Sequence, residues 1–499
     1  MEELKKLAQI IHKRGIAEDS LVDFKRQKPT KEWLLFDALI KGLVSSESEA
    51  LKYLYPDSPS ASGLKMVKSR LRKKLLNQLF FLEFQGQSFK ASHAVEQECF
   101  AKLYQARILV NSGAYEVALP LLKQVLGTSE EYSFNDVAYL ALRSLLHIYV
   151  NLGKKKEFAK ASSQLKKISA CMLADQESEK LILESTLELN SSVAARKKYL
   201  DRIDVILEEM HSLWINAQTY DTFDNYYRLS IWAQELKGNF QSIVELSDNS
   251  EDLLKTEKIH PQRFDHRFNK YIQVYAHLRA KKLEKGLQLA KSYEEAFNPS
   301  SNNWFAFMEN YLLLALHSKR YTEAHYLLEK ILSNPFFNKI NKMAQERWYL
   351  FEAYVHFVDP LKKKPFKLQE LVQNAPSYSK DKEGFNVAIL ILQVMYYLEK
   401  HEIETLEYRM EALKKYAHNH FKDSFSDRSR TFFRLLGVMV RTDFDPWETS
   451  KKSYYLYQKL QRIPTPGDAY AETEIIPYEH LWELILKMLH GLSKARAKA

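Results

Sequence analysis

Glycine and proline are scarce in this sequence, which has 13 glycines and 14 prolines among 499 residues. Together they make up about 5% of the chain, against roughly 12% in ordinary soluble proteins. Folds rich in β-strands need many turns, and turns draw heavily on these two residues. The scarcity therefore predicts an all-α protein.

Cysteines and long apolar runs are also nearly missing. Cys99 and Cys171 lie far apart and share no motif with histidine, which argues against a disulfide framework or a zinc site. The longest stretch without a charge, Gly384 to Leu398, is shorter than the roughly 20 residues that a helix needs to cross a bilayer. The first residues are charged and amphipathic, unlike a secretory signal. We therefore expect a cytoplasmic protein with no membrane span.

Sequence motifs of catalysis are absent as well. The chain has no GxSxG nucleophile motif and no glycine-rich phosphate loop,. His418 and His420 are separated by one residue, so on a helix they face different sides, whereas a catalytic zinc needs at least three ligands. The run Glu399, His401, Glu402 and Glu404 is typical of a polar helix end. We expect no metal, no cofactor and no enzymatic activity.

Helical periodicity is present almost everywhere. From Leu103 to Leu126, apolar residues recur three and four positions apart, and the pattern is interrupted at Asn111-Ser112-Gly113. Such a pattern predicts a helix, a tight turn and a second helix. Similar interruptions follow at 151–153, 237–239 and 318–320, and the first of these is followed by a predicted helix from Lys156 to Ile168. The sequence therefore predicts a series of helix pairs.

The spacing of residues within these pairs resembles that of tetratricopeptide repeats (TPRs). The positions that carry the resemblance are a small or apolar residue, a turn residue, an aromatic residue, an alanine and two further apolar residues; they are Ala106, Gly113, Tyr115, Ala118, Leu122 and Val125 in one copy, and Leu312, Lys319, Tyr321, Ala324, Leu328 and Ile331 in another. The resemblance implies a TPR-like α-solenoid, a right-handed superhelical array of antiparallel helix pairs. Such pairs must stack because no pair buries its shared face alone.

The repeat pattern is irregular in two respects. The distance from Gly113 to Gly153 is 40 residues, against about 34 in the family. Lysine occupies the turn position at Lys281 and Lys319. Breaks in the pattern predict three regions: a basic helical region at residues 1–90, TPR-like repeats at 91–424 and a helical cap at 425–499.

The N-terminal region contains a basic amphipathic segment that predicts a helix from Ala61 to about Leu82. Its apolar stripe should pack against the first repeat pair and bury Leu71 and Leu75. Between Asp57 and Glu83 the chain has no acidic residue and six basic ones, namely Lys65, Lys68, Arg70, Arg72, Lys73 and Lys74. Together with the net charge of +10, this segment makes nucleic acid or an acidic protein a candidate partner.

This segment, with the preceding Leu54-Tyr55-Pro56-Asp57, is similar to the recognition-helix region of winged-helix transcriptional activators. The resemblance implies a basic helix in the major groove and requires a β-hairpin wing, for which Gln85 to Ser88 is the available turn. A basic helix face that is merely solvated is the simpler alternative.

Two functions follow as expectations. The helix-pair pattern and the lack of catalytic motifs favour a non-enzymatic scaffold that binds a protein or peptide partner. The alternative is a nucleic-acid-linked regulator with an N-terminal helix-turn-helix-like basic module and a TPR-like sensor or assembly region.

Overall fold

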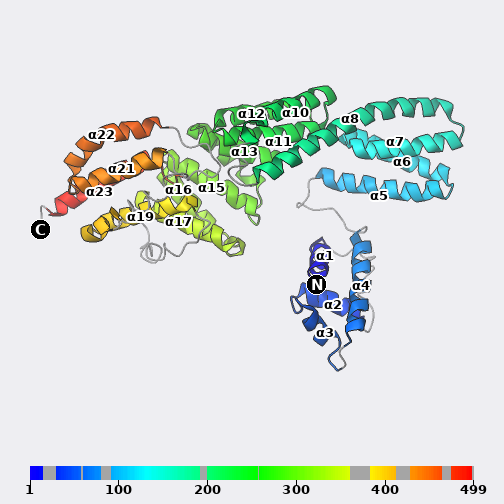
Figure 1. Ribbon diagram of the computed structural model, residues 1–499, viewed down its shortest axis with the longest axis horizontal. Helices are drawn as coiled ribbons and strands as arrows, with labels where there is room; N and C mark the ends of the chain where they lie inside the picture. Colours follow the sequence, from blue (N-terminus) through cyan, green and yellow to red (C-terminus); the bar gives the residue numbers. More distant parts are fainter. Residues whose placement is uncertain are drawn as a thin grey trace. The chain divides into compact units, whose positions relative to one another are not determined.

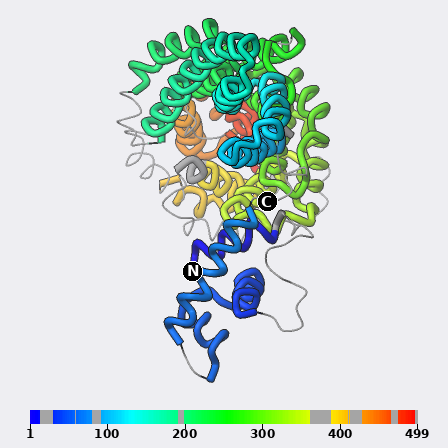
Figure 2. The backbone as a smooth tube through the Cα atoms, turned by 90° about the vertical axis from the view of Figure 1, so that its right-hand side faces the viewer, coloured from blue at the N-terminus to red at the C-terminus, as the bar shows by residue number. Residues whose placement is uncertain are grey.

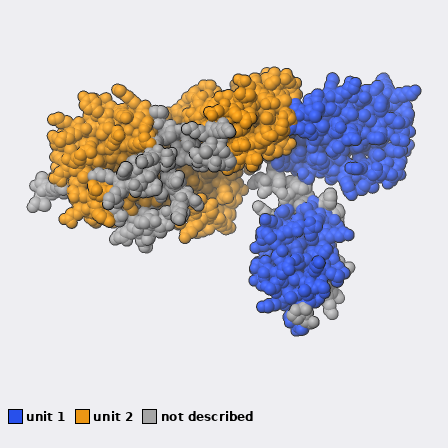
Figure 3. Space-filling view, viewed as in Figure 1, with its two compact units in different colours: residues 1–176, 260–263 blue, residues 177–259, 264–499 orange. Residues whose placement is uncertain are grey.

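The protein is helical throughout the part of the chain that the computed structural model describes, and no strand occurs there (Figure 1). The described residues are 1–14, 30–57, 60–79, 91–190, 199–256, 258–359, 383–408, 410–411, 427–463 and 474–496. The predicted all-α class is thereby confirmed. The chain forms two compact units (Figure 3): unit 1 comprises Met1–Gln176 and His260–Arg263, and unit 2 comprises Glu177–Ile259 and Phe264–Ala499.

The first four helices of unit 1, which we call the N-terminal module, share a core of their own. Ser46 caps the third helix in a capping box: its hydroxyl accepts a hydrogen bond from the Glu49 amide, and the Glu49 carboxylate accepts one from the Ser46 amide,. Ser60 caps the fourth helix by accepting a bond from the Gly63 amide,. The four helices are α1 (Glu2–Arg14), α2 (Lys31–Ile40), α3 (Glu47–Leu54) and α4 (Ala61–Gln78).

The predicted apolar stripe of α4 is buried, but the expected neighbour was wrong. Leu71 and Leu75 are fully buried, as expected. They belong to a cluster whose members all come from the first 79 residues, and α4 packs on α1, α2 and α3. The three short helices together cover the stripe, so no repeat pair is needed to bury it. A single-sequence pattern reveals that a stripe is apolar, but not which element covers it.

Four longer helices complete the description of unit 1: α5 (Ala91–Asn111), α6 (Tyr115–Tyr132), α7 (Asn135–Asn151) and α8 (Lys155–Leu189), of which the last continues into unit 2. The sequence predicts that the helix corresponding to α8 ends near Ile168, and this prediction was wrong. No glycine or proline occurs between Lys155 and Leu189, so no local signal stops the helix.

Unit 2 continues with further helices, which pack mostly on their neighbours in sequence. They are α10 (Ile203–Ala217), α11 (Tyr220–Leu236), α12 (Phe240–Lys255), α13 (His266–Arg279), α14 (Leu283–Tyr293), α15 (Asn302–His317), α16 (Tyr321–Leu332), α17 (Lys342–Val358), α19 (Glu383–Glu399), α21 (Asp427–Arg441), α22 (Pro446–Arg462) and α23 (Tyr478–Arg496), with short 3₁₀ turns at Glu294–Ala296 and Phe337–Lys339. The course of consecutive helices can be followed as a tube in Figure 2.

Close helix packing in unit 2 depends on a small residue at Gly286. A Cβ atom at this position would lie 2.7 Å from Leu314 Cδ2 and 3.1 Å from His277 Cβ. These atoms belong to α15 and α13, so α14 approaches both helices at this point. The alanines at the TPR-like positions, Ala118 and Ala324, are likewise fully buried. Small residues thus let neighbouring helices come together.

The turns within the pairs share one backbone geometry even where their sequences differ. Gly113, Gly153 and Gly238 have positive φ, as do Lys281 and Lys319, with φ of 59° and 56°. In each turn the next amide donates to the carbonyl five residues earlier, for example Lys282 N to His277 O at 2.9 Å. This bond is that of a Schellman helix end. The backbone repeat is therefore more regular than the sequence repeat.

Candidate functional site

The six basic residues predicted as contacts all lie on α4, at positions outside its apolar stripe. Lys65, Arg70, Arg72 and Lys73 are exposed, and Lys68 and Lys74 are half-buried. Residues 80–90, which include the expected hairpin from Gln85 to Ser88, lie outside the described residues. The structure thus places the basic residues on one helix and leaves the predicted wing untested.

Acidic residues of α1, α2 and α3 neutralise three of the six basic residues of α4. Lys68 pairs with Glu47 and Arg72 with Glu3, and Arg70 lies 3.8 Å from Glu32. The remaining cations, Lys65, Lys73 and Lys74, have no carboxylate partner in the described part of the chain. Exposed ion pairs contribute little to stability, but they reduce the positive charge that α4 offers to a phosphate backbone.

A polar cavity of about 270 Å³ lies in unit 2 and is lined mainly by four helices, α11, α13, α15 and α17. Along the chain, each of these helices is separated from the next by one other helix, α12, α14 or α16. The cavity residues of α13 and α15 recur about four positions apart, so they come from one face of each helix. The lining includes Glu235 of α11, Tyr271, Tyr275 and Arg279 of α13, Ala306, Glu309, Asn310 and His317 of α15, and Arg347 of α17.

The polar groups that line this cavity, called the smaller cavity below, are partly connected to one another by hydrogen bonds and ion pairs. Tyr275 donates its hydroxyl to Glu235. Arg347 lies 3.1 Å from Glu309, whose pKa is raised by burial although the positive charge of Arg347 acts in the opposite direction. Burial also raises the pKa of Tyr275. A cavity with convergent polar and aromatic groups is a reasonable place for a ligand or a peptide.

A second cavity, of about 650 Å³, adjoins the first because both are lined by Arg279, Lys281 and His317. The larger cavity is also lined by the C-terminal part of the chain, through Arg428, Arg462, Pro477, Glu479 and His480. Lys281 is accessible to solvent, yet burial lowers the pKa of its ammonium group. This combination is expected at the floor of a concave surface, where water reaches the group but protein replaces much of its hydration.

Arg428 joins the C-terminal helices beside this cavity. Its side chain is 3% exposed. The guanidinium donates to Glu474 at 2.5 and 2.9 Å and to Glu479 at 2.7 and 2.9 Å. It also donates to the backbone carbonyls of Leu460 and Ile463. All its donors are therefore used, and Arg428 is a structural centre without capacity for a ligand.

Two histidines in the wall of the larger cavity have lowered pKa values. His317 Nε2 lies 2.8 Å from the carbonyl oxygen of Glu474, and burial holds its pKa well below the usual value. Burial, helped by the positive charge of Lys319, lowers the pKa of His480 to about 4. The Nδ1 atoms of both rings are buried without a hydrogen-bond partner in the described structure.

We expect these histidines to make unit 2 less stable in acid. Between pH about 6.5 and pH about 4, the unfolded chain takes up a proton at His480 that the folded chain does not bind, so stability falls as the pH is lowered through this window. The variant His480→Gln should show a shallower fall in Tm between pH 7 and pH 4. His211→Gln, at an exposed position on α10, serves as the control. Parallel curves for wild type and His480→Gln would contradict the assignment.

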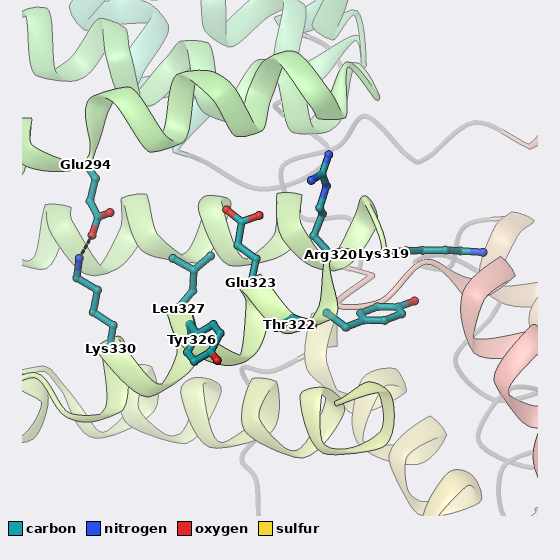
Figure 4. Close-up of a pocket in the computed structure, with 9 residues that line it drawn as sticks. Glu294, Lys319, Arg320, Thr322, Glu323, Tyr326, Leu327 and Lys330 are labelled. Carbon is teal, nitrogen blue, oxygen red and sulfur yellow. Dashed lines mark ion pairs between the residues drawn. The ribbon is translucent and has the colours of Figure 1, made fainter. Parts of the chain in front are cut away.

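A third depression, of about 570 Å³, lies along α16 and differs in its electrostatics (Figure 4). Each cation in its lining has a carboxylate partner: Lys330 pairs with Glu294, Arg320 lies 3.0 Å from Glu284, and Lys319 lies 2.7 Å from Glu483. This surface therefore has no unpaired positive charge to offer to a ligand.

No cluster of metal-binding side chains occurs in the described ranges. His418 and His420 lie outside the described residues. Glu399 and His401 fall at the end of α19, where His401 has φ of 60° in the turn. None of the helices in the described part of the chain combines the length and apolarity that crossing a bilayer requires.

The residues of the two cavities were not identified from the sequence, although one signal was present. Tyr271, Tyr275 and Arg279 recur every four residues and so mark one face of a helix,. Their proximity to Arg347 and Glu474 depends on packing across long sequence separations. Comparison with models of known protein families, with curated proteins and with solved structures found no match.

Proposed function

We propose that the protein is a non-enzymatic scaffold of the TPR type that acts in the cytoplasm and binds a protein or peptide partner. In this proposal the helix pairs wind into a right-handed superhelix, and the first helix of each pair faces the partner. The observation that carries it is the smaller cavity, whose lining comes from the alternating helices α11, α13, α15 and α17. That alternation is what a shared inner surface of stacked pairs requires.

The chemistry of the cavity suits an extended segment of another protein. Tyr271 and Tyr275 supply aromatic surface, and Glu309 and Arg347 supply groups that accept and donate hydrogen bonds,. Tyrosine and arginine are common among the residues that contribute most to binding at protein interfaces. The cavity residues lie on helices, which hold them in fixed positions relative to one another.

Filling the cavity tests this function. The variant Ala306→Trp places a large side chain among the cavity residues, whereas Thr322→Trp makes a matched change at an exposed position in the depression on α16. Wild type and both variants, each checked for folding by circular dichroism, are immobilised and exposed to lysate. We expect a partner that wild type and Thr322→Trp retain and Ala306→Trp loses. Recovery of the chain alone at several salt concentrations would contradict the scaffold function.

A second candidate function is supported by α4, which carries six basic residues after a helix and a turn. In this alternative the N-terminal module binds nucleic acid, and the remaining helices serve as a sensor or assembly platform. Lys65, Lys73 and Lys74 have no carboxylate partner among the described residues, and the side chain of Arg70 is exposed, so these four side chains would contact phosphates first,.

Titration with duplex and single-stranded DNA at two salt concentrations distinguishes the candidates. If Arg70, Lys73 and Lys74 bind phosphates, their joint replacement by alanine should weaken binding and reduce the salt dependence by roughly one slope unit for each lost contact. The control is Lys282→Ala with Lys285→Ala, at exposed positions in unit 2. Failure of the wild type to bind DNA at low salt would end this alternative.

A further inference from the structure

The lining of the larger cavity carries more positive than negative charge. Its cations are Arg279, Lys281, Arg428 and Arg462, and its only carboxylate among the described residues is Glu479. Glu479 is already bound by Arg428, together with the neighbouring Glu474. Arg428 and its two carboxylates together carry one negative charge, so the excess positive charge resides on Arg279, Lys281 and the exposed Arg462.

The guanidinium of Arg279 is oriented by aromatic rings. Its Cζ atom lies 5.9 Å from the ring centroid of Phe240 and 5.6 Å from that of Tyr275, which are distances at which a cation interacts with a ring face. No ion pair or hydrogen bond within the described residues engages this guanidinium, although its positive charge acts to lower the pKa of Glu309 in the smaller cavity. The rings thus hold in place a group whose donors are available.

Lys281 is kept beside Arg279 despite two unfavourable features. Its backbone is left-handed, with φ of 59°, a conformation that costs a lysine more than a glycine. Its ammonium has no carboxylate within ion-pair distance among the described residues, and its pKa is lowered by burial. Lys319, at the same position of the next pair and with a similar φ, has Glu483 as a partner at 2.7 Å.

The histidines add polar groups without adding charge near neutral pH, since burial lowers the pKa values of both. His317 donates its Nε2 proton to the Glu474 carbonyl, so its Nδ1 is a buried acceptor with no donor in the described structure. The Nδ1 of His480 is also unpartnered. Buried polar atoms are rarely left without a hydrogen-bond partner. A hydroxyl group of a ligand could donate to an unpartnered Nδ1 atom, and acidic oxygens of the same ligand could bind the two cations, Arg279 and Lys281.

We propose that the larger cavity is a binding site for a small multivalent anion, a phosphate or a hydroxylated polycarboxylate, held by Arg279 and Lys281. The cavity volume of about 650 Å³ lies in the range of small-molecule sites. Because Pro477, Glu479 and His480 also line it, an occupied site links the C-terminal part of the chain to α13 and α15. The proposal does not depend on the scaffold function, since the anion binds in the absence of any protein partner.

The test uses the full chain, with inorganic phosphate, pyrophosphate and citrate as probes at constant ionic strength and chloride as the reference anion. Tryptophan fluorescence follows binding, and the Tm of the chain is measured in parallel. We expect saturable binding and a higher Tm with at least one probe. Preference for pyrophosphate over citrate identifies a phosphate site, and the reverse order identifies a polycarboxylate site.

The deciding variants are Lys281→Gly and Lys319→Gly. Each removes one lysine from a left-handed turn position where glycine is conformationally favoured,, so both should fold. Loss of a charge-assisted contact should weaken anion binding in Lys281→Gly about tenfold, while Lys319→Gly, outside both cavities, should bind as the wild type does. Equal weakening in the two variants, or no saturable binding by the wild type up to about 10 mM, would overturn the proposal.

Discussion

Replacing Arg428 by alanine is expected to reduce the free energy of unfolding of unit 2 by about 3–5 kcal/mol, the usual loss when one partner of a buried ion pair is removed. The variant leaves Glu474, which is 7% exposed, without its main partner, and it also removes the donors to the Leu460 and Ile463 carbonyls. A buried carboxylate without a partner is costly because its hydration is not replaced.

Urea unfolding followed by tryptophan fluorescence measures this loss. Six of the seven tryptophans belong to unit 2, since Trp33 is the only one in unit 1, so the signal reports mainly on the relevant unit. Arg434→Ala removes an exposed charge from the same helix and should change stability by less than about 0.5 kcal/mol. A loss below about 1 kcal/mol in Arg428→Ala would show that Glu474 finds other partners.

The double variant Arg428→Met, Glu474→Gln separates packing from charge. It removes the buried carboxylate together with the cation, so it should be more stable than Arg428→Ala alone. Glu479, which is less buried than Glu474, can turn towards water in this variant. If the double variant is as unstable as the single one, the hydrogen bonds to the carbonyls contribute more than the ion pairs.

Replacing Leu71 by alanine is expected to destabilise the N-terminal module by about 2–5 kcal/mol, the range for a buried leucine. Leu71 is fully buried in the core formed by α1 to α4, so the change leaves a cavity among short helices. Hydrogen exchange measured by mass spectrometry on peptides from 1–79 should show faster exchange, by about 30-fold or more at one decade per 1.36 kcal/mol.

Two control variants on α4 accompany Leu71→Ala. Met66→Ala truncates a side chain that is 57% exposed and should leave exchange nearly unchanged. Joint replacement of Arg70, Lys73 and Lys74 by alanine should also change stability by only a few tenths of a kcal/mol, because the ion pair to Glu32 is exposed on the arginine side. An equal effect of Leu71→Ala and Met66→Ala would mean that the stripe does not form the core.

The sequence alone determined the helical class of this protein and the position of four of its helix-to-helix turns, at 111–113, 151–153, 237–239 and 318–320. The scarcity of glycine and proline, and the apolar spacing from Leu103 to Leu126, are local properties that any fold of this chain must respect. The interruptions at Gly113, Gly153 and Gly238 coincide with left-handed turns, because glycine adopts that conformation at little cost.

The tertiary structure decided what local signals leave open. Lys281 and Lys319 adopt the left-handed turn because packing of the flanking helices outweighs the preference of a lysine. The 35-residue α8 is an exception, because its continuation beyond the expected end agrees with a local property, the lack of glycine and proline between Lys155 and Leu189. The apolar stripe of α4 packs on α1, α2 and α3 and not on a repeat pair, since an apolar face specifies burial but not the element that covers it.

The candidate sites differ in the same way. The six basic residues of α4 were identified from sequence because they all lie within residues 65–74. The pairing of three of them with Glu3, Glu32 and Glu47 depends on how four helices pack. Arg428 lies 46 positions from Glu474, and Arg279 and His317 meet only where α13 packs on α15. Local periodicity thus determined the helices. Which charges lie together and which are neutralised depends on contacts between residues far apart in the chain, and periodicity does not encode such contacts.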